Sequence, residues 1–246
     1  MVLLVLLAGC GRHRQPQVKN VPAPPPPGSP APTPSPTPEP SATKAASPTP
    51  SVKADTEPRL PKDAKVLYRE VGWASWYGPH FQSRQAANGE LFDTEQMTAA
   101  HRTLPLNSIA RVTNVKTGDS VLLRITDRGP FVVDRVIDLS RAAARRLSVY
   151  QRGTALVRIE VLQSPSPIFS GGRWCVQIGP FTDAPDATQL KDELSRRNKN
   201  LRILMFASPT GPLWLRVRVA DDDKRHAEEL MRGTRTDAEM YLVRMD

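Results

Sequence analysis

Residues 71–77 read Val71-Gly72-Trp73-Ala74-Ser75-Trp76-Tyr77, and this run marks the start of a folded region. The run is rich in β-forming residues and alternates in part between apolar and small or polar positions, which predicts a strand. Ser140 is placed to cap a short helix over 141–147. Further strands are predicted at 109–114, 120–126, 137–139 and 154–162. Many short strands with one small helix indicate a compact β-barrel.

Seven motifs inside this region carry a family resemblance. They are Gly72-Trp-Ala-Ser-Trp-Tyr-Gly78, Ala87-Asn-Gly-Glu90, Thr98-Ala-Ala-His101, Thr103-Leu-Pro105, Val112-Thr-Asn114, Thr126-Asp-Arg-Gly-Pro-Phe131 and Ile137-Asp-Leu-Ser140. In this order they resemble the rare lipoprotein A family, whose fold is a double-psi β-barrel shared with expansins and some endoglucanases. Better-studied members are lytic transglycosylases that prefer peptidoglycan glycan strands stripped of stem peptides. The resemblance therefore implies a six-stranded double-psi β-barrel over 70–163. It also implies endolytic cleavage of the MurNAc-GlcNAc β-1,4 bond, leaving 1,6-anhydroMurNAc ends.

Three residues are candidates for the chemistry. Breaking a glycosidic bond requires a proton for the leaving oxygen, and one carboxyl group can serve as acid and then base when the sugar's own C6 hydroxyl captures the reacting carbon. Asp127 follows the strand predicted over 120–126 and precedes Arg-Gly-Pro, and the resemblance makes it the general acid/base. The resemblance also makes Glu90 a second essential carboxylate, whose charge would raise one of the two pKa values. His101 matches a third site residue that would orient a carboxylate or contact the sugar.

Each of these residues also has an ordinary structural interpretation. Asp127 beside Arg128 would form a turn with a local salt bridge, Glu90 would be an exposed loop acid, and His101 would end a helix. The conjunction of all three within the motif series favours the catalytic interpretation. The chain has four His, none at metal-ligand spacing, so neither a metal nor another cofactor is expected.

A second folded region follows a linker predicted at 164–172. Over 173–246, strands are predicted at 174–178, 201–207, 213–220 and 240–245 and helices at 183–198 and 222–231. The order βαββαβ implies a four-stranded sheet with both helices on one face. With Val176-Gln-Ile-Gly-Pro-Phe181, it resembles the SPOR domain, a module that binds peptide-stripped peptidoglycan and concentrates proteins at division septa.

The SPOR resemblance suggests substrate-binding residues on an exposed sheet face. The candidates are Gln177, Trp214 and Arg216, and the alternative interpretation of Trp214 is a core aromatic. The sequence departs from the family at Ala220-Asp221-Asp222-Asp223, where many members carry a second Gly-Pro-Phe-like turn. Cys175 lies in an apolar run and is predicted to be a small buried side chain.

The N-terminal residues 1–10 predict a secretory signal, since the apolar run is too short to span a bilayer. Leu7-Ala8-Gly9-Cys10 resembles a lipobox, which implies lipidation of Cys10, although no Lys or Arg precedes the apolar run. Gly11 in place of Asp favours an outer-membrane anchor that faces the periplasm. Residues 11–69 are predicted to be a disordered Pro-rich tether, because sixteen of the chain's 25 prolines fall in 16–61. In polyproline II such a tether reaches on the order of 100 Å.

The charge balance limits the possible partners. The formal net charge is +9, but the basic residues are scattered and aromatic residues are sparse, so nucleic acid is not expected as a partner. The expected partners are peptidoglycan glycan strands, membrane lipid through Cys10, and the septal division machinery. The rival function is a non-catalytic, expansin-like or structural peptidoglycan-binding lipoprotein, and an ordinary hydrolase is a third possibility.

Overall fold

The computed structural model of the protein describes residues 57–246 except 61–62, 79–80 and 209–210. The predicted signal sequence, Cys10 and most of the predicted tether lie outside the described residues. The described residues all belong to one compact unit. Among them, no helix has the length and apolar character needed to cross a membrane.

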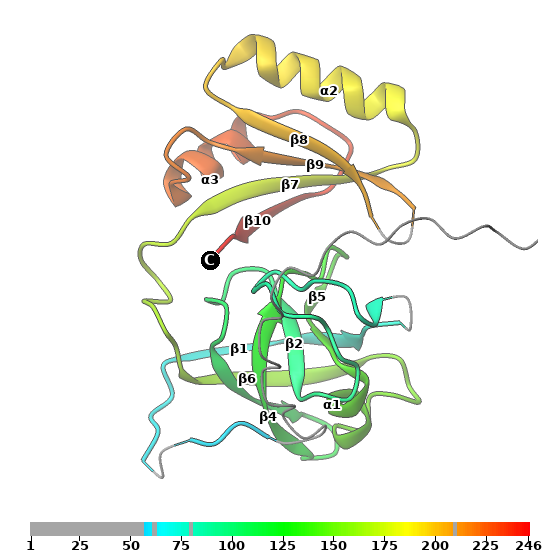
Figure 1. Ribbon diagram of the computed structural model, residues 1–246, viewed down its shortest axis with the longest axis vertical. Coiled ribbons are helices and arrows are strands. Elements are labelled where there is room, and N and C mark those ends of the chain that lie inside the picture. The colour runs from blue at the N-terminus through cyan, green and yellow to red at the C-terminus, as the bar shows by residue number, and fades with distance from the viewer. Residues whose placement is uncertain (1–56, 61–62, 79–80, 209–210) are drawn as a thin grey trace, which may run out of the picture. The chain divides into compact units, whose positions relative to one another are not determined.

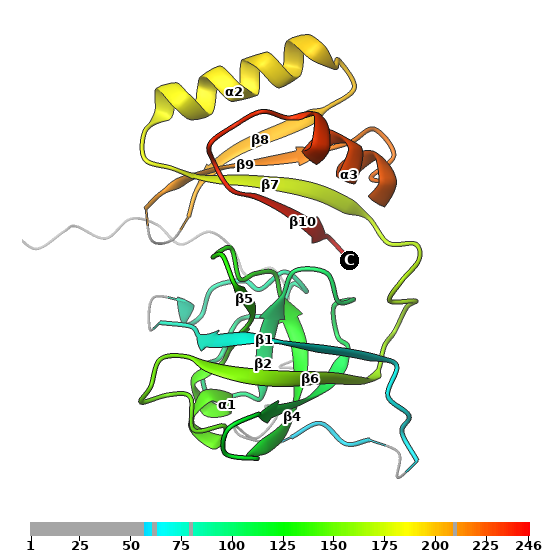
Figure 2. The ribbon, with the colours of Figure 1, turned by 180° about the vertical axis from the view of Figure 1, so that it is seen from behind.

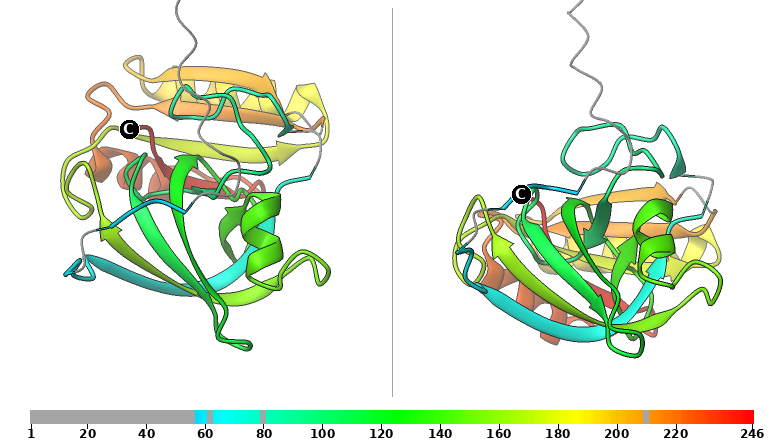
Figure 3. Two further views of the ribbon diagram at one scale, coloured as in Figure 1. Left: turned by 60° about the horizontal axis from the view of Figure 1, so that its bottom comes forward. Right: turned by 90° about the horizontal axis from the view of Figure 1, so that it is seen from below.

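Six strands close into the predicted barrel (Figures 1 and 3), in the spatial order β1-β5-β2-β4-β3-β6. Strands β1 and β5 pair in parallel, as do β2 and β4, and the remaining neighbours are antiparallel. The barrel core is aliphatic, with Val157, Ile159 and Val161 of β6 all pointing inward because they alternate along the strand. The bounds are β1 Tyr68–Trp76, β2 Thr98–His101, β3 Ile109–Asn114, β4 Ser120–Asp127, β5 Arg135–Leu139 and β6 Ala155–Gln163.

The short helix α1 (Arg141–Arg146) begins where predicted. The hydroxyl of Ser140 accepts a hydrogen bond from the backbone N–H of Ala143 at 3.2 Å, which satisfies one of the free N–H groups at the start of the helix. The helix buries Ala142, Ala143 and Ala144 against the barrel core. The helix therefore packs against the barrel core through small side chains.

Strand β2 (Thr98–His101) is the one barrel strand that the sequence patterns do not predict. It lies between β4 and β5, and all four of its residues are buried. A strand buried on both faces has no polar side to alternate with, so the period-two pattern is missing. The ordinary interpretation of His101 as a helix-end residue is wrong, since it ends this strand.

The second region has the predicted βαββαβ order and forms a four-stranded antiparallel sheet, β10-β7-β9-β8. Figures 1 and 2 show both helices on the same face of this sheet. The apolar side of helix α2, Ala187, Leu190 and Leu194, packs against alternate strand residues such as Val176 and Val217. The bounds are β7 Trp174–Phe181, α2 Ala184–Arg197, β8 Arg202–Ala207, β9 Leu213–Arg218, α3 Lys224–Gly233 and β10 Met240–Arg244.

The opposite face of this sheet also forms a cluster of buried residues. Cys175, Trp214, Tyr241 and Val243 gather there, and Phe131 of the barrel domain packs against them. The Phe131 ring lies 5.6 Å from that of Trp214 and 5.7 Å from that of Tyr241, measured between centroids. The prediction that Cys175 is buried is confirmed.

Candidate active site

Asp127 is the last residue of β4, as the sequence predicts. Its carboxylate accepts three hydrogen bonds, from the hydroxyl of Tyr77 at 3.2 Å and from the backbone N–H groups of Ala87 at 3.0 Å and Arg128 at 2.8 Å. Burial raises the pKa of Asp127, although these three donors pull it back toward its ordinary value. The structure therefore holds this carboxyl group in a fixed orientation and favours its protonated form more than water would.

A second buried carboxyl group, Asp138 of β5, lies two strands away. Asp127 and Asp138 both pair with Ala100 of β2, one from each side. Strand spacing of about 4.8 Å places their Cα atoms roughly 10 Å apart. Paired residues on neighbouring strands project to the same face, so the two carboxyl groups face the same space.

The environment of Asp138 favours a bound proton. Burial raises its pKa to about 6, and the nearby charge of Asp127 adds to this effect, while Arg135 opposes it. The Nη2 of Arg135 donates to one carboxyl oxygen at 3.1 Å, and the other oxygen, Oδ1, is buried without a hydrogen-bond partner. Asp127 and Asp138 thus form a pair of interacting acids that can retain a proton near neutral pH.

Glu90 has a different environment from the one predicted. It lies in the loop that also supplies the Ala87 N–H to Asp127, but its carboxylate forms a bidentate pair with Arg124 at 2.6 and 2.8 Å. This pair lowers the pKa of Glu90, despite some opposing desolvation. Glu90 is not among the groups that shift the pKa of Asp127, and the like-charge effect in this site runs from Asp127 to Asp138, whose pKa it raises.

His101 is buried and its ring faces away from the two aspartates. Its Nε2 lies 2.9 Å from the carboxylate of Glu70, and its Nδ1 accepts from the N–H groups of Thr103 and Leu104 at 3.2 and 3.1 Å. Burial lowers the pKa of His101, while its bond to Glu70 opposes that shift. His101 does orient a carboxylate, but that carboxylate is Glu70. A direct contact with sugar stays a prediction.

The two aspartates line a cavity of about 740 Å³. This volume is within the range of small-molecule binding sites. Its barrel wall includes Trp76, Tyr77, Phe92, Asp127, Arg128, Phe131, Arg135 and Asp138. Aromatic rings and charged groups therefore line one space, a combination suited to a sugar, which has apolar C–H faces and polar edges.

The cavity walls include most of the unpartnered polar atoms in the described part of the chain. Five buried side-chain nitrogen or oxygen atoms lack a hydrogen-bond partner there, and four of them belong to cavity residues: Arg128 Nε, Arg135 Nε, Asp138 Oδ1 and Arg216 Nε. An unpartnered buried polar atom costs about 1–3 kcal/mol. Such a concentration in one place indicates a site whose polar groups are completed by a ligand.

The three binding residues predicted in the second domain, Gln177, Trp214 and Arg216, all line the same cavity. Their alternation along β7 and β9 places them on the helix-free face of the sheet. The predicted exposure of this face is wrong for Gln177 and Trp214, which are 2% and 5% exposed. Phe131 packs on Trp214, which is therefore a core aromatic that also borders the cavity, and binding of substrate by Trp214 stays a prediction.

Sequence reasoning missed Asp138 and Tyr77 as site residues. Both occur in the quoted motifs, but Tyr77 counted only as a strand aromatic and Asp138 only as part of a short apolar strand. The available signal was the ionisable residue between Ile137 and Leu139, which are both fully buried. A carboxyl group at such a position must be paired or protonated.

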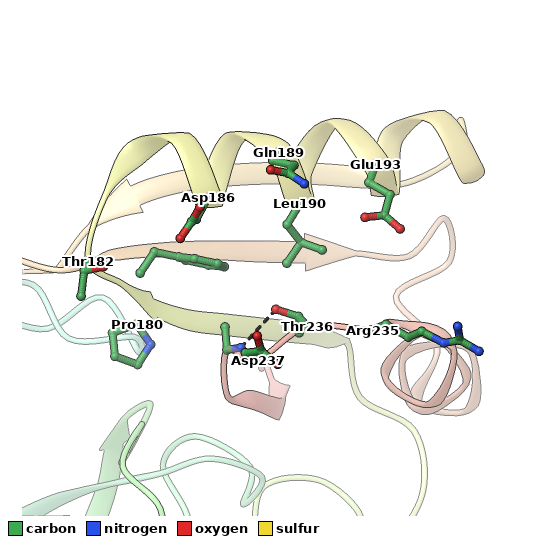
Figure 4. Close-up of a pocket in the computed structure, with 11 residues that line it drawn as sticks. Pro180, Thr182, Asp186, Gln189, Leu190, Glu193, Arg235, Thr236 and Asp237 are labelled. Atoms are coloured by element: carbon green, nitrogen blue, oxygen red, sulfur yellow. Dashed lines mark hydrogen bonds between the residues drawn. The ribbon is translucent and has the colours of Figure 1, made fainter. Parts of the chain in front are cut away.

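A second hollow of about 430 Å³ lies beside α2. Figure 4 shows Asp186, Gln189 and Glu193 of the helix along one side, with Thr236 and Asp237 across from them. No unpartnered buried polar atom of the described residues lines it, so it lacks the feature that marks the larger cavity. The described residues also contain no group of three or more His, Cys, Asp or Glu side chains arranged to hold a metal ion.

Comparisons with known proteins match both domains. The family described as "Lytic transglycolase" matches residues 69–159, and the SPOR domain family matches residues 170–235. The protein named "Endolytic peptidoglycan transglycosylase RlpA" of Helicobacter pylori strain J99 is 39% identical over 160 residues, which cover 54% of this chain and 51% of that protein. The protein of the same name from Pseudomonas aeruginosa strain UCBPP-PA14 is 57% identical over 98 residues, 40% of this chain and 28% of that protein.

The chain thus spans about half the length, or less, of these curated relatives. Among solved structures, an expansin mutant of Clavibacter michiganensis in complex with cellohexaose is 15% identical, with a TM-score of 0.33. The match covers 47% of this chain and 71% of the expansin.

Proposed function

We propose that the chain belongs to the rare lipoprotein A family and that its barrel cleaves the glycan strands of peptidoglycan as an endolytic transglycosylase. The observation that carries this proposal is the pair of acids, the partly buried Asp127 and the buried Asp138, on one wall of a sugar-sized cavity. A glycosidic oxygen leaves only when it receives a proton, and a carboxyl group with a raised pKa supplies one near neutral pH.

The reaction needs one proton to be given and one to be taken back. In the first half, the carboxyl of Asp127 protonates the O4 of GlcNAc as the bond from that oxygen to C1 of MurNAc breaks. In the second half, the resulting carboxylate accepts the proton of the C6 hydroxyl of MurNAc, whose oxygen bonds to C1. The products are a free GlcNAc 4-hydroxyl and a 1,6-anhydroMurNAc end, and no water molecule is consumed.

Asp138 and Tyr77 would tune this proton transfer. The charge of Asp127 raises the pKa of Asp138, so Asp138 stays protonated to a higher pH than an isolated aspartate and adds no negative charge that would oppose the carboxylate formed on Asp127. The Tyr77 hydroxyl donates to Asp127 and stabilises the carboxylate formed midway through the reaction. Tyr77 thus opposes the effect of burial and keeps Asp127 able to release its proton.

Glu90 and His101 would support the site from opposite sides. Glu90 lies about half exposed in the loop that contacts Asp127. There its carboxylate can accept a hydrogen bond from a hydroxyl group of the glycan while it stays paired with Arg124. His101 holds the turn after β2 through two backbone N–H groups and so fixes the strand on which both aspartates depend. We assign Glu90 to binding of the glycan and His101 to positioning of β2.

The proposed location is the periplasmic side of the outer membrane, with an anchor at Cys10 and enrichment at the septum. The lipobox resemblance and the SPOR domain support this placement. Labelling cells with a fatty-acid analogue should modify the unaltered chain and not Cys10→Ser. Soluble Cys10→Ser protein that still carries the label would contradict lipidation at this residue.

The activity is tested by incubating the purified protein with peptide-stripped glycan strands and analysing the products by mass spectrometry. We expect anhydro-ended fragments from the unaltered chain and none from Asp127→Asn. Asp63→Asn is the matched control, because it makes the same chemical change at an exposed position before β1. Circular dichroism of both variants checks that they are folded.

Two other outcomes would lead to different conclusions. Fragments with reducing ends that incorporate oxygen from labelled water would indicate a hydrolase. Binding of strands by folded protein without any fragment would favour the expansin-like or structural role.

A further inference from the structure

The cavity that holds the two aspartates is not formed by the barrel alone. Gln177, Trp214 and Arg216 of the second domain border it, as do Pro180 and Phe206. The two domains contact each other beside this cavity. Phe131 of the barrel packs on Trp214 and Tyr241, and the guanidinium of Arg102 lies 5.5 Å from the Tyr241 ring centroid. The backbone N–H of Arg244 in β10 donates to the carbonyl of Arg102 at 3.0 Å.

Arg128 links this contact directly to the acid. Its backbone N–H donates to Asp127, and its guanidinium donates to the carbonyls of His101, Leu104 and Asp246 at 2.6–2.9 Å. The residue next to the acid is therefore held by both domains. This arrangement fixes the sheet of the second domain relative to the site.

Arg216 is the cavity residue of the second domain with the chemistry to read a charge. Its Nη2 donates to the amide oxygen of Gln177 at 3.2 Å, and its guanidinium lies over the Phe206 ring at 5.2 Å. Its Nε is buried without a partner, and no carboxylate of the described residues forms an ion pair with it. By contrast, Arg135, on the barrel side of the cavity, is already paired with Asp138.

We propose that the cavity is one binding site shared by the two domains, in which Arg216 pairs with the free lactyl carboxylate of a MurNAc residue. This inference rests on the proposed function for the identity of the polymer. When a stem peptide is attached, the lactyl carboxyl is an amide and carries no charge. A strand without peptides exposes one carboxylate per disaccharide, which matches an arginine that lacks an acidic partner.

The shared site changes the role of the second domain. A module that only concentrates the protein on the wall would bind a strand at a place separate from the site of cleavage. As a wall of the cavity, the second domain instead holds the glycan strand that is being cut, and Arg216 determines which MurNAc residue lies next to the two aspartates. Selection of stripped strands then occurs at the active site itself.

The test uses the full chain carrying Asp127→Asn, so that the ligand is bound without being cut. The probe is a soluble peptidoglycan tetrasaccharide with free lactyl carboxylates, titrated by calorimetry. We expect one molecule bound per chain. The same tetrasaccharide with its lactyl groups amidated should bind about ten-fold more weakly, as expected for loss of one charge-assisted bond.

Adding Arg216→Gln should remove this discrimination. We expect the double variant to bind both ligands alike, about ten-fold more weakly than the Asp127→Asn chain binds the free acid. The matched control is Arg225→Gln in the same background, because Arg225 is an exposed residue of α3 on the opposite, helix-covered face of the sheet. This control should bind like its parent.

Three results would overturn the shared site. They are two independent bound molecules per chain, equal affinity for free and amidated ligand, or undiminished affinity in the Arg216→Gln variant. Cleavage of long strands by the unaltered chain is measured separately. Intact cleavage with any of these results would refute the shared site alone, whereas carboxylate-dependent binding without cleavage would refute the proposed activity alone.

Discussion

Replacing Asp138 by Asn should change how the stability of the protein depends on pH. In the folded chain burial raises the pKa of Asp138 to about 6, compared with 3.8 for an exposed aspartate. A difference of about two pKa units corresponds to about 3 kcal/mol of unfolding free energy. Because the folded state binds this proton more tightly, the contribution is complete at low pH and is lost as the pH rises through about 6.

The expected size follows from the two titrations. At pH 4 the unfolded carboxyl is already partly ionised, so the change between pH 4 and pH 7 is about 2 kcal/mol rather than the full amount. The Asn side chain has the same shape and does not ionise in this range. The unfolding free energy of the variant, minus that of the unaltered chain, should therefore rise by about 2 kcal/mol from pH 4 to pH 7.

Urea unfolding followed by tryptophan fluorescence at half-unit pH steps measures this difference. Asp63→Asn is the control, and its curve should run parallel to that of the unaltered chain. Parallel curves for Asp138→Asn as well would show that the carboxyl titrates at an ordinary pKa in the folded state. The inference that the two acids hold a proton near neutral pH would then be refuted.

Three further substitutions separate the roles of the residues around the acids. Tyr77→Phe removes a hydrogen bond that lowers the pKa of Asp127, so the alkaline limb of the pH profile of kcat/KM should move to higher pH; a shift to lower pH would contradict the contact. His101→Ala leaves the N–H groups of Thr103 and Leu104 without partners and removes one of two hydrogen bonds at Glu70, which the Tyr68 hydroxyl still contacts, so urea unfolding should show a loss of about 2–4 kcal/mol. Full stability with abolished cleavage would mean that His101 acts on the substrate itself. Glu90→Gln removes a partly exposed ion pair and should change the unfolding free energy by less than about 1 kcal/mol. The same variant should reduce cleavage at least ten-fold, and unchanged cleavage would remove Glu90 from the site.

Much of the fold is encoded in local patterns that a single sequence reveals. Alternation along 109–114 predicts β3 at its observed bounds, and Ser140 marks the start of α1. These predictions succeed because each depends on residues close together in the chain.

The parts that failed depend on contacts between distant residues. Strand β2 has no alternating pattern because both of its faces are buried: Ala99 packs in the barrel core, and Ala100 packs with Tyr77 and Phe92. Asp138 gains its raised pKa from burial and from Asp127, which reaches it only through the pairing of both strands with Ala100. The burial of Trp214 depends on Phe131, which lies 83 positions earlier in the chain. None of these neighbours is visible in a window of sequence.

The same desolvation explains both the proposed chemistry and a cost in stability. Removing the two aspartates from water raises their pKa values, which makes a proton available near neutral pH, but it also disfavours the folded state once they ionise. A residue kept for stability would not be placed in this way. With Asn at position 127 or 138, the unfolding free energy of the variant minus that of the unaltered chain should therefore be larger at pH 7 than at pH 4. The same substitution should abolish or weaken cleavage. Opposite effects on stability and activity from one substitution distinguish a functional acid from a structural one, because loss of a structural acid would lower both together.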